Sequence, residues 1–185
     1  MKQKEIEHIK KEIPIRFYED EIGCFRTEDG YLDIYQINPR DLVNSDVDEI
    51  EMDCFKWAKF YKTYAADVEI ISMMFPCDTS LQQAFWRKKL ANNKNPLFQE
   101  MITTKLRELE WREKKAASKE YFLVFFYPDK ESIADAVRNV GNSLEFGRDG
   151  LLQPISKKKK EQILFKLANK NSLIFRRRED DEKKK

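Results

Sequence analysis

The stretch Thr27–Ile37, TEDGYLDIYQI, decides the fold class because it contains a turn followed by an alternating strand. Its Asp29-Gly30 pair is a strong signal for a tight turn between antiparallel strands. After the turn, successive side chains alternate between two faces until Asn38-Pro39 ends the strand. Because apolar and polar residues alternate on both sides of the turn, we predict a β-hairpin over residues 15–38.

A helix and a buried strand follow this β-hairpin. Asn44, Ser45 or Asp46 is available as the helix N-cap. The apolar positions then recur at steps of three and four residues, which is typical of a helix. These positions are Val47, Ile50, Cys54, Trp57, Tyr61, Tyr64 and Ala65. The β-branched and apolar run Val68–Phe75 stops at Pro76 and predicts a buried strand.

The middle of the chain predicts a helical hairpin. Thr79 or Ser80 caps a short helix to about residue 91, and Asn95-Pro96 opens a longer one to about residue 118. The apolar positions expected on the longer helix are Leu97, Met101, Leu106 and Leu109.

A third strand and two more helices complete the pattern. The strand is Tyr121–Tyr127, and a helix from about Glu131 carries the apolar stripe Ile133, Val137, Val140 and Leu144. Residues 147–150 predict a loop. A last helix over residues 156–168 is weakened by lysines at the positive end of its dipole. A β-hairpin, then strands separated by helices, indicates an α+β fold with helices packed on a mixed sheet.

Length and composition indicate one domain. The 185 residues are 41% hydrophobic, which is enough material for one packed core. We expect a charged lead-in over residues 1–12, a single α+β interaction domain over 13–172, and a charged disordered tail over 173–185. The 35 Lys and Arg balance 33 Asp and Glu, so any recognition of anions is local.

The residue types exclude the common catalytic centres. None of the five glycines belongs to a phosphate-binding loop or a dinucleotide-binding motif. The one histidine, His8, lies in the charged lead-in, where a triad or a zinc site has no support. The three cysteines form no CxxC pair and are expected to be reduced structural thiols. We therefore expect no enzymatic activity, no cofactor and no metal.

Two features are candidates for binding. The short helix presents Gln82, Gln83, Trp86, Arg87 and Lys88, which form either an edge of the core or a partner interface, because Trp and Arg are enriched among interface hot spots. The second feature is the run Lys157, Lys158, Lys159 and Lys160. It is either a solvated surface or a contact for the phosphates of DNA or anionic lipid.

The order of these segments resembles a known family. DGYLDIYQI, DVEIISMMFP, SLQQAFWRKKLANNKNP, EYFLVFFYPD and ILFKLANKNS, in this order, are similar to the N-terminal domain of conjugation ATPases of type IV secretion systems, the TraE, TrbE and CagE class. The resemblance covers about residues 13–172. It is closest to versions from Gram-positive plasmids and integrative conjugative elements.

The resemblance implies a docking role without catalysis. In that family this domain precedes an ATPase motor and contacts the membrane-embedded parts of the transfer channel. The chain stops before any motor, so we expect a stand-alone relative, with a fragment of a longer ATPase as the alternative. The expected function is docking with channel or ATPase subunits, peripherally at the cytoplasmic membrane face. The alternative is a DNA-binding accessory protein that uses the C-terminal basic stretch.

Overall fold

The computed structural model describes residues 14–169, so the predicted lead-in and tail lie outside the described residues. The described chain forms two compact units. Residues 14–72 and 121–169 make up the first, which we call the sheet unit. Residues 73–120 make up the second, which we call the helical-hairpin unit.

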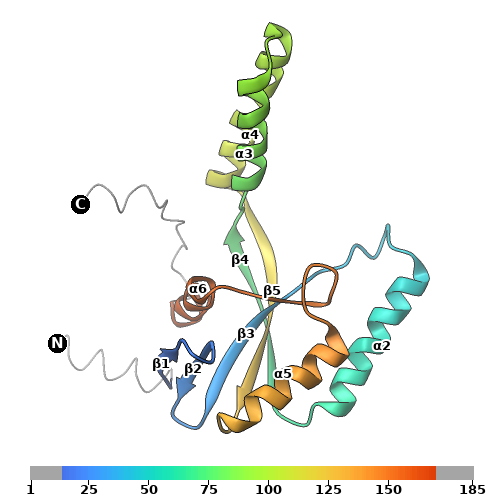
Figure 1. Cartoon of the computed structure of the whole chain (residues 1–185), viewed down its shortest axis with the longest axis vertical. Helices are drawn as coiled ribbons and strands as arrows, with labels where there is room; N and C mark the ends of the chain where they lie inside the picture. Colours follow the sequence, from blue (N-terminus) through green and yellow to red (C-terminus); the bar gives the residue numbers. More distant parts are fainter. Residues whose placement is uncertain (1–13, 170–185) are drawn as a thin grey trace, which may run out of the picture. The chain divides into compact units, whose positions relative to one another are not determined.

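An antiparallel sheet forms the framework. Its strands are β1 (Ile15–Glu19), β2 (Cys24–Thr27), β3 (Tyr31–Ile37), β4 (Val68–Pro76), β5 (Ala117–Tyr127) and β6 (Leu152–Pro154). The order is β1-β2-β3-β5-β4, and β6 also pairs with β3 (Figure 1). The α+β class is confirmed. The prediction of a mixed sheet is refined, because the four strand pairs with a defined register all run antiparallel.

The predicted β-hairpin is present, with an additional strand. β2 and β3 flank the Asp29-Gly30 turn, where the Thr27 N–H donates to the Gly30 carbonyl at 2.9 Å. The first predicted arm is in fact two strands, β1 and β2. They are separated by a turn that ends at Gly23, whose φ of 72° favours glycine.

Two helices, α2 (Val47–Thr63) and α5 (Glu131–Leu144), lie side by side and contribute to the core of the sheet unit (Figure 1). The predicted stripe of α5 is confirmed. That of α2 is right for Trp57 and Tyr64, which pack against the core, and wrong for Val47, Cys54 and Tyr61, which are exposed. Phe60, which is not among the predicted positions, is the buried residue of the helix. The face of Trp57, Phe60 and Tyr64 follows the same three- and four-residue spacing but is rotated around the helix.

The last helix, α6 (Lys157–Ala168), forms despite the lysines at its start. The Ser156 side chain caps it by accepting a hydrogen bond from the Lys159 N–H at 3.3 Å. Lys157 Nζ lies 2.9 Å from an Asp20 carboxylate oxygen, so a carboxylate from the β1–β2 turn offsets the unfavourable charge. Ile163 is fully buried on the inner face of the helix.

The helical-hairpin unit contains α3 (Ser80–Asn92) and α4 (Pro96–Lys115), as predicted. Ile102, Leu106 and Leu109 are the buried residues of α4. Of the four apolar positions expected on this helix, Leu106 and Leu109 are buried, whereas Leu97 and Met101 are exposed. The predicted end of the helix near residue 118 is also too late, since β5 begins at Ala117.

Candidate functional site

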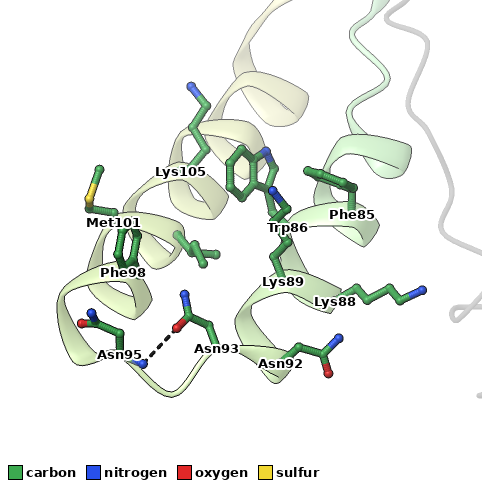
Figure 2. Close-up of a pocket in the computed structure, with 11 residues that line it drawn as sticks. Phe85, Trp86, Lys88, Lys89, Asn92, Asn93, Asn95, Phe98, Met101 and Lys105 are labelled. Carbon is green, nitrogen blue, oxygen red and sulfur yellow. Dashed lines mark hydrogen bonds between the residues drawn. The ribbon is translucent and has the colours of Figure 1, made fainter.

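An open groove lies between α3 and α4, beside the loop that joins them (Figure 2). Its apolar lining consists of Phe85, Trp86, Phe98, Met101 and Ile102. Trp86 lies between the two helices, with Phe98 and Met101 on the α4 side. The groove has a volume of about 1130 Å³. Residues of one compact unit, from α3, α4 and the loop between them, therefore build the whole groove.

Lysines give the groove a positive charge, and two of its three lysines have no carboxylate partner among the described residues. Lys88, Lys89 and Lys105 line it, and none of the described residues that line it is acidic. Lys89 Nζ lies 4.8 Å from the centroid of the Phe85 ring and 5.4 Å from that of Trp86, which are cation–π distances. Lys105 Nζ pairs with Glu108 at 3.1 Å. Within residues 14–169, Lys88 and Lys89 have no carboxylate partner.

A buried polar network holds the base of the helical hairpin. Gln83 Nε2 donates to Thr79 Oγ1 at 2.8 Å and to Glu113 Oε2 at 2.6 Å. Thr79 Oγ1 in turn donates to the Leu109 carbonyl at 3.1 Å. Arg87 Nη2 donates to Gln83 Oε1 at 2.9 Å, so the network joins α3 to α4 at several points.

The loop end of the helical hairpin is held by asparagines. The Asn95 side chain accepts from the Leu97 N–H at 3.0 Å and caps α4, whose first residue is Pro96. The Asn93 side chain accepts from the Asn95 N–H at 2.9 Å, as Figure 2 shows. Both ends of the helical hairpin are thus held by hydrogen bonds between described residues.

The structure divides the predicted interface residues. Trp86 and Lys88 line the groove, whereas Gln82 is exposed on α3 and does not. Gln83 is only 3% exposed, so the structure corrects its expected place on a surface. Arg87 joins Gln83 to Glu110 and does not line the groove.

The sequence interpretation missed most of the groove. The sequence pattern does not single out Phe85, Lys89, Phe98 and Lys105, and it marks Met101 only as an apolar position of the longer helix. The available signal was the pair of short segments on either side of the Asn-rich loop, AFWRKK and PLFQEM, each combining aromatic and charged residues. Periodicity alone does not show that their apolar side chains remain uncovered.

The four lysines predicted as an anion contact do not act as one group. Lys160 is 6% exposed and forms a buried ion pair with Asp33, while its Nζ also donates to the Gly23 carbonyl at 2.7 Å. Lys157 is paired with Asp20. The structure therefore corrects the prediction for Lys160, whose charge is satisfied inside the sheet unit.

The buried ionisable groups of the sheet unit do not form a reactive centre. Burial, reinforced by the Asp33 carboxylate, raises the pKa of the Cys24 thiol to about 12, so the thiol is protonated at neutral pH. Burial also raises the pKa of the hydroxyls of Tyr35 and Tyr127. Residues 14–169 contain no cluster of His, Cys, Asp and Glu able to hold a metal ion.

Comparison with known families gives a match over most of the chain. Residues 16–170 match the family described as the archaeal TraC-like domain. The chain belongs to the TraC-like family. This membership supports a conjugation-related role for the TraC-like chain, and the finer resemblance to the TraE, TrbE and CagE class stays a prediction.

Other comparisons add one relative. The TraC-like chain is 22% identical over 176 residues to an uncharacterised protein of Bacillus anthracis, pXO2-10. The alignment covers 86% of this chain and 77% of the relative. No solved structure matches the chain. Among the described helices, none combines the length and apolar character needed to cross a membrane.

Proposed function

We propose that this TraC-like protein is a non-catalytic docking component of a conjugative type IV secretion apparatus. It binds channel or ATPase subunits at the cytoplasmic face of the membrane, to which it is attached peripherally. Family membership supports the conjugation-related part of the proposal. The groove of the helical-hairpin unit supports the docking part.

The observation that carries the docking proposal is an apolar surface that the fold does not use. The helical hairpin has its own buried residues on α4 and its own polar network at the base. Phe85, Phe98 and Met101 nevertheless remain exposed around one groove. Gathered large apolar side chains on a surface are typical of a site for another macromolecule.

The lysine run gives weaker support to the alternative, a DNA-binding accessory protein. Two of its four lysines already pair with carboxylates, Lys157 with Asp20 and Lys160 with Asp33. Phosphate binding at these positions would have to compete with those ion pairs. We therefore assign docking to the helical hairpin rather than to α6.

Co-purification tests the proposal. A tagged chain is recovered from cells that carry the transfer region, and its partners are identified by mass spectrometry. We expect channel or ATPase subunits to be recovered with the native chain and with Trp111→Ala. We expect their loss with the double variant Phe98→Ala/Met101→Ala. Trp111 is an exposed aromatic residue of α4 outside the groove and is the matched control.

One outcome overturns the proposal. If no transfer protein is recovered with the native chain, under conditions in which the rest of the apparatus assembles, the chain is not a docking component. Circular dichroism of each variant checks that the fold is retained.

A further inference from the structure

The size and depth of the groove indicate a macromolecular segment rather than a small ligand or a membrane. At about 1130 Å³ it exceeds the roughly 300–1,000 Å³ of ordinary small-molecule pockets. Ile102, which lines it, is 6% exposed, so the floor lies well below the surface. A flat bilayer contacts the rim of such a groove but not its floor.

The walls of the groove determine the backbone conformation of the occupant. Both walls are α-helices, whose backbone N–H and C=O groups are already bonded within each helix. The two helices therefore offer no unpaired backbone N–H and C=O groups with which a partner strand could form a sheet. A segment that binds here must satisfy its own backbone hydrogen bonds, as a helix does.

The charge of the groove determines the chemistry of the occupant. Lys88 and Lys89 lack carboxylate partners within the described chain, and Lys89 is held over the Phe85 and Trp86 rings. An approaching carboxylate would gain a charge-assisted contact beside an apolar floor. A basic segment would be repelled by Lys88 and Lys89, whereas the charge of Lys105 is already compensated by Glu108.

The groove is also prepared for binding. The Gln83 network fixes one end of the helical hairpin, and the asparagine loop fixes the other. A preorganised site loses less conformational freedom on association, which favours affinity.

We propose that this groove binds an acidic amphipathic helix of a partner protein. This inference rests on the proposed docking function and names the partner's chemistry. The helix places apolar side chains, spaced at i, i+3, i+4 and i+7, on the floor formed by Trp86 and Ile102. Its Asp and Glu residues flank this stripe and meet Lys88 and Lys89.

Site-specific photo-crosslinking tests the inference in the intact chain. A benzoylphenylalanine replaces Phe98 in the groove or, as the matched control, Trp111 outside it; these residues of α4 are 55% and 65% exposed. After irradiation in cells that carry the transfer region, mass spectrometry identifies the crosslinked segment. We expect the Phe98 position to capture a helical segment with acidic residues beside apolar ones, and the Trp111 position not to capture it.

Other products at Phe98 overturn the inference. These are lipid, nucleic acid, a basic or extended protein segment, or the same segments that Trp111 captures. An absence of any Phe98 product, while the native chain co-purifies with transfer proteins, also overturns it.

A charge reversal tests the role of the lysines separately. Lys88→Glu/Lys89→Glu should lower the yield of the Phe98 crosslink by about tenfold, because attraction becomes repulsion. The matched variant Lys114→Glu/Lys115→Glu changes two exposed lysines of α4 that do not line the groove. Its yield should equal that of the unmodified background. Equal losses in both variants would mean that only net charge matters, which contradicts the inference.

The two proposals fail in different ways. Capture of an acidic amphipathic helix from a protein outside the transfer apparatus would keep the groove inference and reject the proposed function. Co-purification of transfer subunits that survives Phe98→Ala/Met101→Ala would keep the docking function and reject the groove as its site.

Discussion

Asp33 lies in β3 between the residues that pair with β2 and those that pair with β6. Strand β2 pairs with Tyr31 and Leu32, and β6 pairs with Tyr35 to Ile37. The Asp33 carboxylate accepts the Ile34 N–H at 2.7 Å and the Lys160 ammonium. A charged residue in a buried strand is thus matched to a lysine from a helix 127 residues later.

Removing Lys160 tests this buried pair. Burial raises the pKa of Asp33, and Lys160 opposes that rise. Lys160→Met should cost about 3–5 kcal/mol of unfolding free energy at neutral pH, because it leaves an uncompensated buried carboxylate. The pKa of Asp33 should then rise further, so the folded variant holds a proton that the unfolded chain lacks. Its stability therefore falls as pH rises above the unfolded pKa.

Urea unfolding at pH 5 and pH 8 measures this effect. The loss caused by Lys160→Met should be larger at pH 8. In the background of Asp33→Asn, the loss caused by Lys160→Met should not depend on pH in this way. If Lys160→Met costs the same free energy at pH 5 and pH 8 in the chain that keeps Asp33, the Asp33 carboxylate is not the cause.

Gly30 gives a second prediction for a single residue. A Cβ at this position would collide with the Tyr127 carbonyl, because β3 begins directly beside the end of β5. Gly30→Ala should lower the unfolding free energy by about 1–3 kcal/mol through this overlap. Gly147→Ala is the control, since a Cβ there meets no atom within 4 Å, although its φ of 112° adds strain. Thermal denaturation should show the larger loss at Gly30.

Among the elements, α3 and α4 depend on polar contacts as well as apolar ones. Gln83→Leu would leave the Thr79 hydroxyl and Glu113 without their shared donor. We expect a loss of about 1–3 kcal/mol. Hydrogen exchange should show it as faster exchange of α3 and α4 amides, with α5 unchanged. The neighbouring Gln82→Ala should have almost no effect, because Gln82 is exposed and lies outside the network. If amide exchange is equally fast in both variants, Gln83 does not have this role.

Substitutions in the lysine run of α6 should have opposite effects on stability, because its four lysines occupy different environments. Lys158 is exposed near the positive end of the helix dipole. Lys158→Glu should therefore raise the unfolding free energy by about 0.3–1 kcal/mol. Lys160→Glu should be strongly destabilising, because it places two carboxylates together in the interior. Chemical denaturation that ranks the two variants equally would show that the lysines are equivalent.

For the whole molecule, we expect no hydrolysis of ATP. The chain has neither a phosphate-binding loop motif nor a dinucleotide-binding motif. A phosphate-release assay of the purified chain should stay at the background rate, beside a Walker-type ATPase as the positive control. Hydrolysis that survives repeated purification and is lost in a point variant of this chain would contradict the expectation.

Much of the architecture was predictable because its signals are local. The Asp29-Gly30 turn, the strands beside Pro76 and Pro128, the helical hairpin and the stripe of α5 all follow from short-range patterns. The split of the first arm into β1 and β2 was missed, since the turn at residues 20–23 has no strong dipeptide signal. The three-residue strand β6 was missed because it exists only through pairing with β3.

The sequence by itself determined the α+β class, the positions of most elements and the absence of common nucleotide-binding motifs, because each is encoded by neighbours along the chain. The tertiary structure alone decided which face of α2 is buried, which lysines are free, and that Trp86, Phe98 and Met101 share a groove. Burial and ion pairing depend on what another element places opposite a side chain. Strand β3 places Asp33 opposite Lys160, so this lysine is buried and paired. No element of the described chain covers Phe98, so this side chain stays exposed.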